Sequence, residues 1–283
     1  MLWNTKIKKY KDGTKNIYYA KKPCFSDKVY KIDEYGEVIE KPKDENEKGN
    51  KKKRLLLCGG IYEEIPKSKV TELRSDNLKR AKDVIYDISY ENDFEYFITC
   101  TLNPNEYECK DVITVYKMLK NWLSNKNQRN GLQYLIIPEY QNNGNIHIHG
   151  LVKGTLQYQD SGRVIYQGKA YKRETLKRKK IDIAELKTVF NITDWKFGFS
   201  TAIKLDSNKI AISRYITKYI TKGNNKIFGR YYLSSRGIVR KPQIEYTHTD
   251  SFDDIPLPSF EPWNGNSYKY DLQIEGESHC NIT

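Results

Sequence analysis

The chain has 283 residues, of which 38% are apolar and 13% aromatic, and its 49 Lys and Arg against 36 Asp and Glu give a net charge of +13. This length allows one large domain or a domain with appendages, and the aromatic content can fill a core beneath a very polar surface. No run approaches the ~18 apolar residues of a membrane span, which argues against a membrane protein, and the basic excess favours a polyanion as partner.

The charge is divided unevenly along the chain. Residues 245–283 carry eight acidic residues and one Lys, a net charge of −7, which leaves +20 for residues 1–244. A basic body of this kind binds phosphates without sequence preference, although a solvated Lys-rich surface has the same composition. The acidic tail is open to three interpretations, as a disordered segment, a contact for host proteins or a cover for the basic cleft.

The cysteines and the first residues indicate where the protein resides. Five cysteines, at positions 24, 58, 100, 109 and 280, show no CxxC or CxH spacing, and an odd number fits reduced thiols better than disulfides. The start, MLWNTKIKKYKDGTK, lacks the apolar core of a signal peptide. We therefore expect a cytoplasmic protein, in the cytoplasm of a bacterial host, with no membrane partner.

Residues 1–69 are predicted to form a β-rich appendage that ends in a basic linker. VYKIDEYGEVIE alternates around a turn at Tyr35-Gly36, and the charged run KPKDENEKGNKKKR after it is typical of a loop. Apolar residues at helical spacing predict a helix over 70–90. FEYFITCTLNP predicts a strand that stops at Asn103-Pro104, and a second helix is expected over 111–124.

The second half of the chain alternates strands and helices less regularly. QYLIIPEY and NIHIHGLVKG predict two strands around NNGN, and the nine basic residues between Lys153 and Lys180 predict a loop or hairpin along a phosphate backbone. A short helix is expected over 183–190, a strand at WKFGFSTAIK, a helix over 209–222 before Gly223, and an Arg-rich strand and turn at FGRYYLSSRGIVRKPQ. This order predicts an α+β fold with a central antiparallel sheet over 70–244, followed by the acidic tail 245–283.

Two of the four histidines, His147 and His149, stand two positions apart on a predicted strand. Alternate side chains of a strand share a face, so both imidazoles point to one side while Ile146 and Ile148 point to the other. This pair would form a partial, open metal site. Two half-exposed histidines on an amphipathic strand would give the same pattern.

The hairpin before the histidine pair decides whether a carboxylate joins it. A three-residue loop with a left-handed Gly144 would pair Glu139 with His147 and Tyr140 with Ile146, whereas a two-residue Asn-Gly turn would put Tyr140 on the histidine face. In the first register the carboxylate and both imidazoles are close enough to share one cation. Such a set leaves positions open for water and substrate, and suits Mg²⁺ or Mn²⁺, with Zn²⁺ as a further possibility.

The sequence SRYITKYITKG contains YITK twice in succession. At 100° per residue, Tyr215, Tyr219, Lys218 and Lys222 share a ~100° arc of the predicted helix. An adjacent apolar stripe is formed by Ile212, Ile216 and Ile220, so the core does not require the tyrosines. A nearby ammonium favours the phenolate form of a phenol that is otherwise a weak nucleophile, and Lys218 is the candidate for that role.

Together these motifs resemble the HUH endonuclease superfamily, in particular its rolling-circle replication initiators. HIH at 147–149 with Gly150 matches the His-hydrophobic-His motif, and Glu139 stands where phage-type members carry an acidic ligand. FITCTLNP at 97–104 resembles the first motif of the family, and YITKYITK at 215–222 resembles the two-tyrosine form of the third. The similarity spans about residues 70–242, and SSRGIVRKP resembles a Ser-Arg-Gly segment of many such phage proteins.

The resemblance implies both a fold and a reaction. The fold would be related to ferredoxin and RRM folds, with the histidines on the sheet and the tyrosines on a flanking helix. The protein would nick single-stranded DNA at a replication origin through Tyr215 or Tyr219, helped by Lys218 and by a metal on His147, His149 and Glu139. A 5′-phosphotyrosyl bond and a free 3′-OH for a polymerase would result, and the second tyrosine would allow rejoining. Binding of the DNA is assigned to Lys222, Arg214, Arg236 and Arg240.

Two other function classes remain open on the sequence. Two-tyrosine transposases and mobilisation relaxases share the chemistry, although relaxases more often use three histidines. A non-catalytic module could instead stack single-stranded nucleic acid on Tyr96, Phe97, Trp195 and Phe197. The chain shows no Gly-Lys-Ser/Thr phosphate loop, so strand separation is expected to come from a host helicase.

Overall fold

The computed structural model describes residues 2–25, 31–32, 38–39, 75–220, 226–247 and 267–272. The chain divides into two compact units. One unit is the continuous segment Leu73–Pro242, and the other combines Met1–Glu72 with Gln243–Thr283. None of the described helices combines the length and apolar character needed to cross a lipid bilayer.

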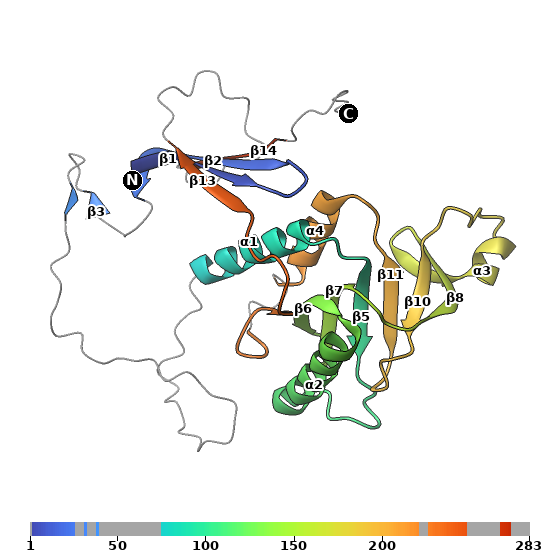
Figure 1. Ribbon diagram of the computed structural model, residues 1–283. Coiled ribbons are helices and arrows are strands. Elements are labelled where there is room, and N and C mark those ends of the chain that lie inside the picture. Colours follow the sequence, from blue (N-terminus) through green and yellow to red (C-terminus); the bar gives the residue numbers. More distant parts are fainter. Residues whose placement is uncertain are drawn as a thin grey trace, which may run out of the picture. The chain divides into compact units, whose positions relative to one another are not determined.

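The larger unit is built on an eight-stranded sheet in which every neighbouring pair is antiparallel (Figure 1). The strand order is β12-β6-β7-β5-β11-β10-β8-β9. The predicted α+β fold with a central antiparallel sheet is therefore confirmed. The strands are β5 (Tyr96–Thr101), β6 (Gln133–Tyr140), β7 (Ile146–Lys153), β8 (Tyr158–Tyr166), β9 (Lys169–Lys172), β10 (Thr188–Ile192), β11 (Ser200–Lys204) and β12 (Leu233–Ser234). The helices are α1 (Ser75–Glu91), α2 (Val112–Asn130), α3 (Arg173–Arg178) and α4 (Lys209–Lys218).

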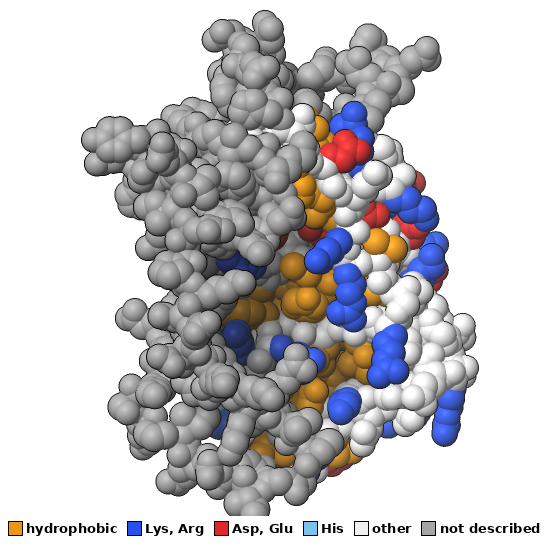
Figure 2. Space-filling model, turned by 60° about the vertical axis from the view of Figure 1, so that its left-hand side comes forward, with side chains coloured by type: hydrophobic (Ala, Val, Ile, Leu, Met, Phe, Trp, Pro, Cys, Tyr) orange, Lys and Arg blue, Asp and Glu red, His pale blue; other side chains and the backbone are white. Residues whose placement is uncertain are grey.

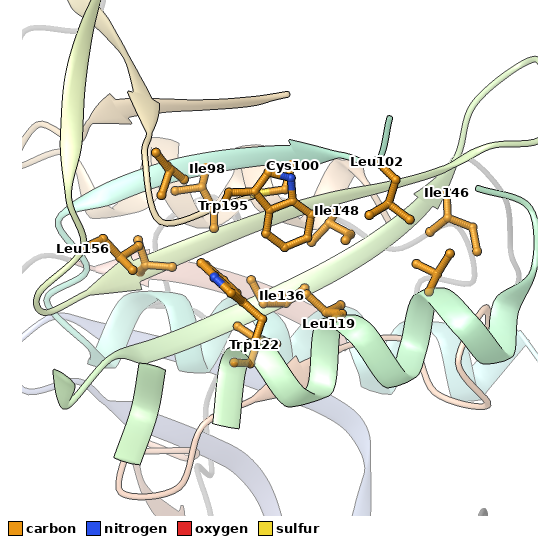
Figure 3. Packing of buried hydrophobic residues seen from close by; sticks show 14 of the residues in the cluster. Ile98, Cys100, Leu102, Leu119, Trp122, Ile136, Ile146, Ile148, Leu156 and Trp195 are labelled. Carbon is orange, nitrogen blue, oxygen red and sulfur yellow. The ribbon is translucent and has the colours of Figure 1, made fainter. Parts of the chain in front are cut away.

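Alternation along the central strands gives the sheet two apolar faces with different partners. On one face, Ile136 of β6 and Ile148 of β7 share a buried cluster with Leu119 and Trp122 of α2 (Figure 3). On the other face, the intervening side chains share a second buried cluster with α1 and α4. That second cluster includes Leu135, Ile137, Leu151, Ile85, Ile88, Ile216 and Ile220. The predicted apolar stripe of the tyrosine helix is thus buried against the sheet.

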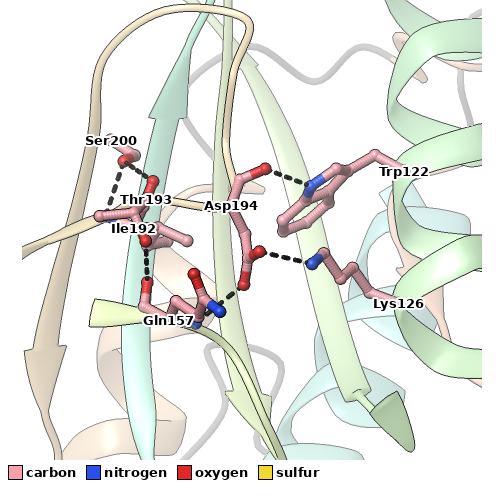
Figure 4. A network of polar contacts seen from close by, with 7 residues as sticks. All are labelled: Trp122, Lys126, Gln157, Ile192, Thr193, Asp194 and Ser200. Carbon is pink, nitrogen blue, oxygen red and sulfur yellow. Dashed lines mark hydrogen bonds and ion pairs between the residues drawn. The ribbon is translucent and has the colours of Figure 1, made fainter. Parts of the chain in front are cut away.

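The loop between β10 and β11 is fastened to α2 by Asp194 (Figure 4). Its carbonyl accepts a hydrogen bond from the indole N–H of Trp122 at 3.1 Å, and its carboxylate lies 2.6 Å from the Lys126 ammonium. Burial alone would raise the pKa of Asp194, but the hydrogen bonds from Lys126 and from the Gln157 backbone lower it. The next residue, Trp195, donates its indole N–H to the carbonyl of Thr101 at 3.2 Å, which fixes the end of β5.

Local signals account for most of the helix boundaries. The side chain of Asp111 accepts hydrogen bonds from the backbone of Ile113 and Thr114 and starts α2, which ends at a left-handed Gly131 with φ of 62°. Helix α2 is therefore longer than predicted. Helix α4 ends at Lys218 with Tyr219 as its C-cap, earlier than the predicted residue 222. Residues 221–225, including Lys222, lie outside the described part of the chain.

The predicted helix over 183–190 is wrong, because part of this segment is a strand. Val189 pairs with Ile203 of β11 and with Arg163 of β8, so β10 lies between two neighbours and gains backbone hydrogen bonds on both sides. The basic segment before it does form the predicted hairpin, from β8 and β9, followed by α3. Gln167 and Gly168 both have positive φ, as a tight two-residue hairpin turn requires.

The smaller unit joins the two ends of the described sequence in one sheet of order β13-β1-β2-β14. Its strands are β1 (Leu2–Lys9), β2 (Lys15–Phe25), β13 (Gln243–Thr247) and β14 (Ser267–Leu272). Two short strands, β3 (Lys31–Ile32) and β4 (Val38–Ile39), pair as the predicted hairpin around Tyr35-Gly36 requires. Part of the acidic tail is therefore strand rather than free chain.

Candidate functional site

The hairpin between β6 and β7 places the two histidines and Glu139 on one face. Gln141 donates its backbone N–H to the carbonyl of Asn145 at 2.8 Å, and Gly144 has φ of 84°. This three-residue loop pairs Glu139 with His147 and Tyr140 with Ile146. The predicted register is confirmed, and the alternative that would have put Tyr140 opposite His147 is excluded.

Two threonines of β5 hold the histidine rings, and the sequence analysis missed both. Thr99 is the cross-strand partner of His149 and Thr101 that of His147. The Thr99 hydroxyl lies 3.1 Å from Nδ1 of His149, and the Thr101 hydroxyl lies 3.0 Å from Nε2 of His147. A hydroxyl can donate or accept, so each threonine can serve either tautomer of its histidine. The signal was the same two-residue spacing in FITCT that had identified the histidines.

Glu139 contacts the second histidine directly. Its carboxylate lies 2.9 Å from Nε2 of His149, and both side chains are largely buried. His147 is half-buried, and burial lowers the pKa of its imidazole although the charge of Glu139 acts to raise it. The neutral imidazole, which is the form that binds metal ions, is therefore favoured at His147.

The donor set fits a divalent cation, although it is not fully assembled. The two imidazole centroids are 5.8 Å apart, and rings that share one ion through nitrogen at ~2.1 Å can have centroids up to roughly 6.5 Å apart. Among the described residues, however, no three His, Cys, Asp or Glu side chains already surround one point as a bound ion requires. Binding would require His147 to turn from Thr101 and His149 to exchange its hydrogen bond with Glu139 for the ion.

The tyrosines of α4 lie over the histidine face. The ring of Tyr219 stacks on that of His149 with centroids 3.9 Å apart, and Phe97 of β5 packs beside both tyrosines. Tyr219 donates its hydroxyl to the hydroxyl of Tyr215 at 2.7 Å. The predicted gathering of two phenols on one helix face is confirmed, and the structure adds that this face meets His149.

The two tyrosines differ in environment. Tyr215 is 47% exposed, whereas Tyr219 is half-buried between the helix and the sheet. Burial raises the pKa of the Tyr219 phenol well above its ordinary value, and the hydrogen bond to Tyr215 and the charges of Tyr215 and Glu139 act in the same direction. Tyr219 is thus held protonated, as a hydrogen-bond donor to the oxygen of Tyr215.

The predicted basic residues divide between this site and another part of the unit. Lys218 lies beside the first tyrosine, with its ammonium 6.0 Å from the Tyr215 ring centroid, and Arg214 is exposed on the same helix. Arg236 and Arg240 instead line a cavity between α2 and the segment around β12. Lys222 lies outside the described residues.

An open cavity of about 540 Å³ adjoins the histidines. It lies beside the β6–β7 loop and is within the size range of ligand sites, roughly 300–1,000 Å³. Its lining consists of Glu139, Tyr140, Gln141, Asn142, Asn143, His147, His149 and Tyr219. A substrate group placed there would meet the donor set and one of the two phenols.

The surface suggested for a non-catalytic module is largely buried. Phe97 is 8% exposed and belongs to the cluster with α1 and α4, and Trp195 is 4% exposed in the cluster with α2. Tyr96 is stacked on Tyr158 with centroids 4.2 Å apart. These rings are packing residues, so they do not offer a platform for bases.

Residues 95–224 match a family model for replication-associated proteins of the ORF2 type. The matched span is slightly less than half of the chain and runs from β5 to just beyond α4, so it contains the histidines, the threonines and both tyrosines. It supports a relation to replication-associated proteins, in agreement with the resemblance in sequence. No match was found among curated proteins or among solved structures.

Proposed function

We propose that this protein is a replication initiator that nicks and rejoins single-stranded DNA at an origin. The observation that carries the proposal is the contact between Tyr219 and His149, with Tyr215 hydrogen-bonded behind it. This contact places two phenols against the donor set, which neither a core nor a simple binding surface requires. The family match supports a role in replication.

In the proposed reaction, a tyrosine oxygen attacks the phosphorus of the scissile phosphodiester in line. A bond from the phenolic oxygen to phosphorus forms, the bond from phosphorus to the 3′ oxygen breaks, and that oxygen takes a proton to become a free 3′-OH. The phosphate stays on the protein as a 5′-phosphotyrosyl ester, so its bond energy is kept. Attack by a 3′-OH on this ester reverses the step and rejoins the strand without ATP.

The first attack is assigned to Tyr215. Its hydroxyl is the more exposed of the two, and it receives the hydrogen bond from Tyr219, which stabilises the negative charge that develops when the phenol loses its proton. The Lys218 ammonium beside the ring adds to this effect. Tyr219 would then serve the second cleavage after a round of synthesis.

Glu139, His147 and His149 would hold Mg²⁺ or Mn²⁺, which supplies positive charge to the scissile phosphate when bound. Thr99 and Thr101 orient the two imidazoles, a role that partners of metal-bound histidines commonly have. Single-stranded origin DNA would be the substrate. A host helicase and a host polymerase would separate the strands and extend the free 3′-OH.

The test is formation of a covalent adduct. The protein is incubated with Mn²⁺ and a labelled single-stranded oligonucleotide from the origin of its own replicon, and adducts that survive denaturation are measured. We expect an adduct with the wild type, none with Tyr215→Phe combined with Tyr219→Phe, and strong loss with His147→Ala. Tyr166→Phe, in the β8–β9 hairpin, is the matched control and should leave the yield unchanged.

Two outcomes would contradict the proposal in different ways. A wild-type protein that forms no adduct with any strand of its replicon would exclude the nicking reaction. An adduct that forms equally well with His147→Ala would leave the tyrosine chemistry intact but remove the metal site from it.

A further inference from the structure

A second cavity lies on the opposite side of the sheet from the histidines. It has a volume of about 640 Å³ and lies between α2, β6 and the segment around β12. Tyr134 of β6 lines it, and Tyr134 belongs to the face of the sheet that packs on α2, whereas Glu139 points to the other face. The cavity is therefore separate from the tyrosine site, at the β12 edge of the sheet.

The lining of this cavity is strongly basic. Four cations line it, Lys120, Arg230, Arg236 and Arg240, and the lining includes no carboxylate. Within the described part of the chain, none of these four makes an ion pair with an acidic side chain. Cations elsewhere do, since Lys126 pairs with Asp194, Lys187 with Asp206 and Lys209 with Asp93. Four like charges around one concave space raise the positive potential there and favour an anion.

Three tyrosines complete the lining, and their rings are partly exposed. They come from three different elements, since Tyr116 belongs to α2, Tyr134 to β6 and Tyr232 to the residue just before β12. Aromatic rings beside cations form the combination that binds nucleotides, because bases stack on the rings while phosphates meet the positive charges. Figure 2 shows one face of the molecule on which described Lys and Arg side chains alternate in this way with hydrophobic ones.

We infer that this cavity binds a nucleotide unit of single-stranded DNA, with its phosphate on Lys120, Arg230, Arg236 and Arg240 and its base against Tyr134 or Tyr232. The choice of DNA rests on the proposed function, whereas the nucleotide chemistry rests on the cavity itself. A strand bound in both places passes around the β12 edge of the sheet. The cavity then holds DNA beside the site of cleavage without taking part in the chemistry.

Binding of the full chain to a fluorescent single-stranded oligonucleotide, measured by anisotropy at several salt concentrations, tests this. Each lost phosphate contact lowers the steepness of log K against log salt by about 0.7 for single strands. Arg236→Gln combined with Arg240→Gln should therefore lower it by about 1.4 and weaken binding. Arg80→Gln, an exposed position on α1, is the matched control and should change neither quantity.

The contribution of the base is tested by Tyr232→Ala. Loss of one stacking ring should weaken binding by about 5-fold or more with little change in salt dependence. Competition identifies the source of the nucleotide: displacement by a deoxynucleoside monophosphate indicates a site for single nucleotides, and displacement by oligonucleotides alone indicates a site for a strand. Both results support nucleotide recognition, whereas equal displacement by inorganic phosphate contradicts the stacking role.

The inference is overturned if the arginine variants, with melting temperatures equal to that of the wild type, bind with unchanged affinity and unchanged salt dependence. Its failure is distinguishable from failure of the proposed function. The cavity variants should still form the covalent adduct with a short oligonucleotide at saturating concentration. A wild type that forms no adduct but loses DNA affinity in the arginine variants would keep the cavity and exclude the nicking reaction.

Discussion

Tyr219 of α4 and His149 of β7 stack face to face, with their ring centroids 3.9 Å apart. The contact joins a helix and a strand that are separated by five other elements in the sequence. It fixes the end of α4, where the helix stops, against the most buried of the donor side chains. The position of both hydroxyls therefore depends on the packing of one ring.

This contact predicts different effects for two substitutions of Tyr219. Tyr219→Phe keeps the ring and should change the free energy of unfolding by less than ~1 kcal/mol, because only an exposed-side hydroxyl bond is lost. Tyr219→Ala removes the stacked ring and should cost about 1–3 kcal/mol. Urea denaturation measures both. Equal losses in the two variants would show that the ring does not contribute through stacking.

Removal of the threonine hydroxyl beside His149 should weaken metal binding. Thr99→Val keeps the shape of the side chain but leaves Nδ1 of His149 without its 3.1 Å partner. Affinity for Mn²⁺ should fall roughly 10- to 100-fold, the usual effect of losing such a partner, as measured by titration calorimetry. Thr201→Val is the matched control, since Thr201 pairs with Thr99 across β11 and is exposed. A similar fall in both variants would assign the effect to the strand and not to the histidine.

Gly150, which follows the second histidine, should not tolerate a side chain. A Cβ at this position would lie 2.4 Å from Cδ1 of Ile136 and 2.9 Å from the carbonyl oxygen of Leu135. Gly150→Ala should therefore lower the free energy of unfolding by roughly 1–3 kcal/mol. Ile136→Val removes the nearer atom, so the double variant should be less destabilised than the sum of the two single ones. Strict additivity would contradict the proposed clash.

The lowered pKa of His147 predicts how stability of the metal-free protein depends on pH. Because the folded pKa lies below the ordinary value of about 6.5, the unfolded chain binds more protons between these two values. Stability should fall as the pH drops through that window, and this group should have no effect above it. Thermal unfolding between pH 8 and pH 5 should show a smaller acid loss in His147→Gln than in the wild type. An equal loss would assign the pH dependence to other groups.

The two tyrosines should contribute unequally to the first cleavage. In a single-turnover assay, Tyr215→Phe should reduce the initial rate of adduct formation more than Tyr219→Phe, because Tyr215 is the more exposed and the hydrogen-bond acceptor of the pair. The adduct that remains in each variant should map to the other tyrosine by peptide mass analysis. A larger loss in Tyr219→Phe would reverse the assignment.

Local sequence was sufficient for the parts of the site that neighbouring residues determine. The Asn-Asn-Gly loop with a left-handed Gly144 set the register that brings Glu139 opposite His147, and both follow from turn chemistry. The spacing of Ile216 and Ile220 predicted which side of α4 is buried. These features lie within one hairpin or one helix, so a pattern of few residues describes them.

Features that depend on distant strands were not predictable in the same way. Thr99 and Thr101 became partners of the histidines only because β5 lies next to β7. Val189 was expected in a helix, but its strand gains hydrogen bonds from β8 and β11 on both sides, and pairing of this kind overrides local preference. The segregation of Arg236 and Arg240 from the tyrosine site likewise depends on which face of the sheet each segment meets.

The sheet made by β1, β2, β13 and β14 has a consequence for the order of folding. Thr5 pairs with Thr247, so this pairing closes a very long loop, while Leu73–Pro242 is one continuous segment with its own two buried clusters. Long-range pairing is slow because the entropy of loop closure must be overcome before any contact forms. During synthesis we expect the continuous segment to fold first, with β1 waiting unpaired until residues 243–247 leave the ribosome.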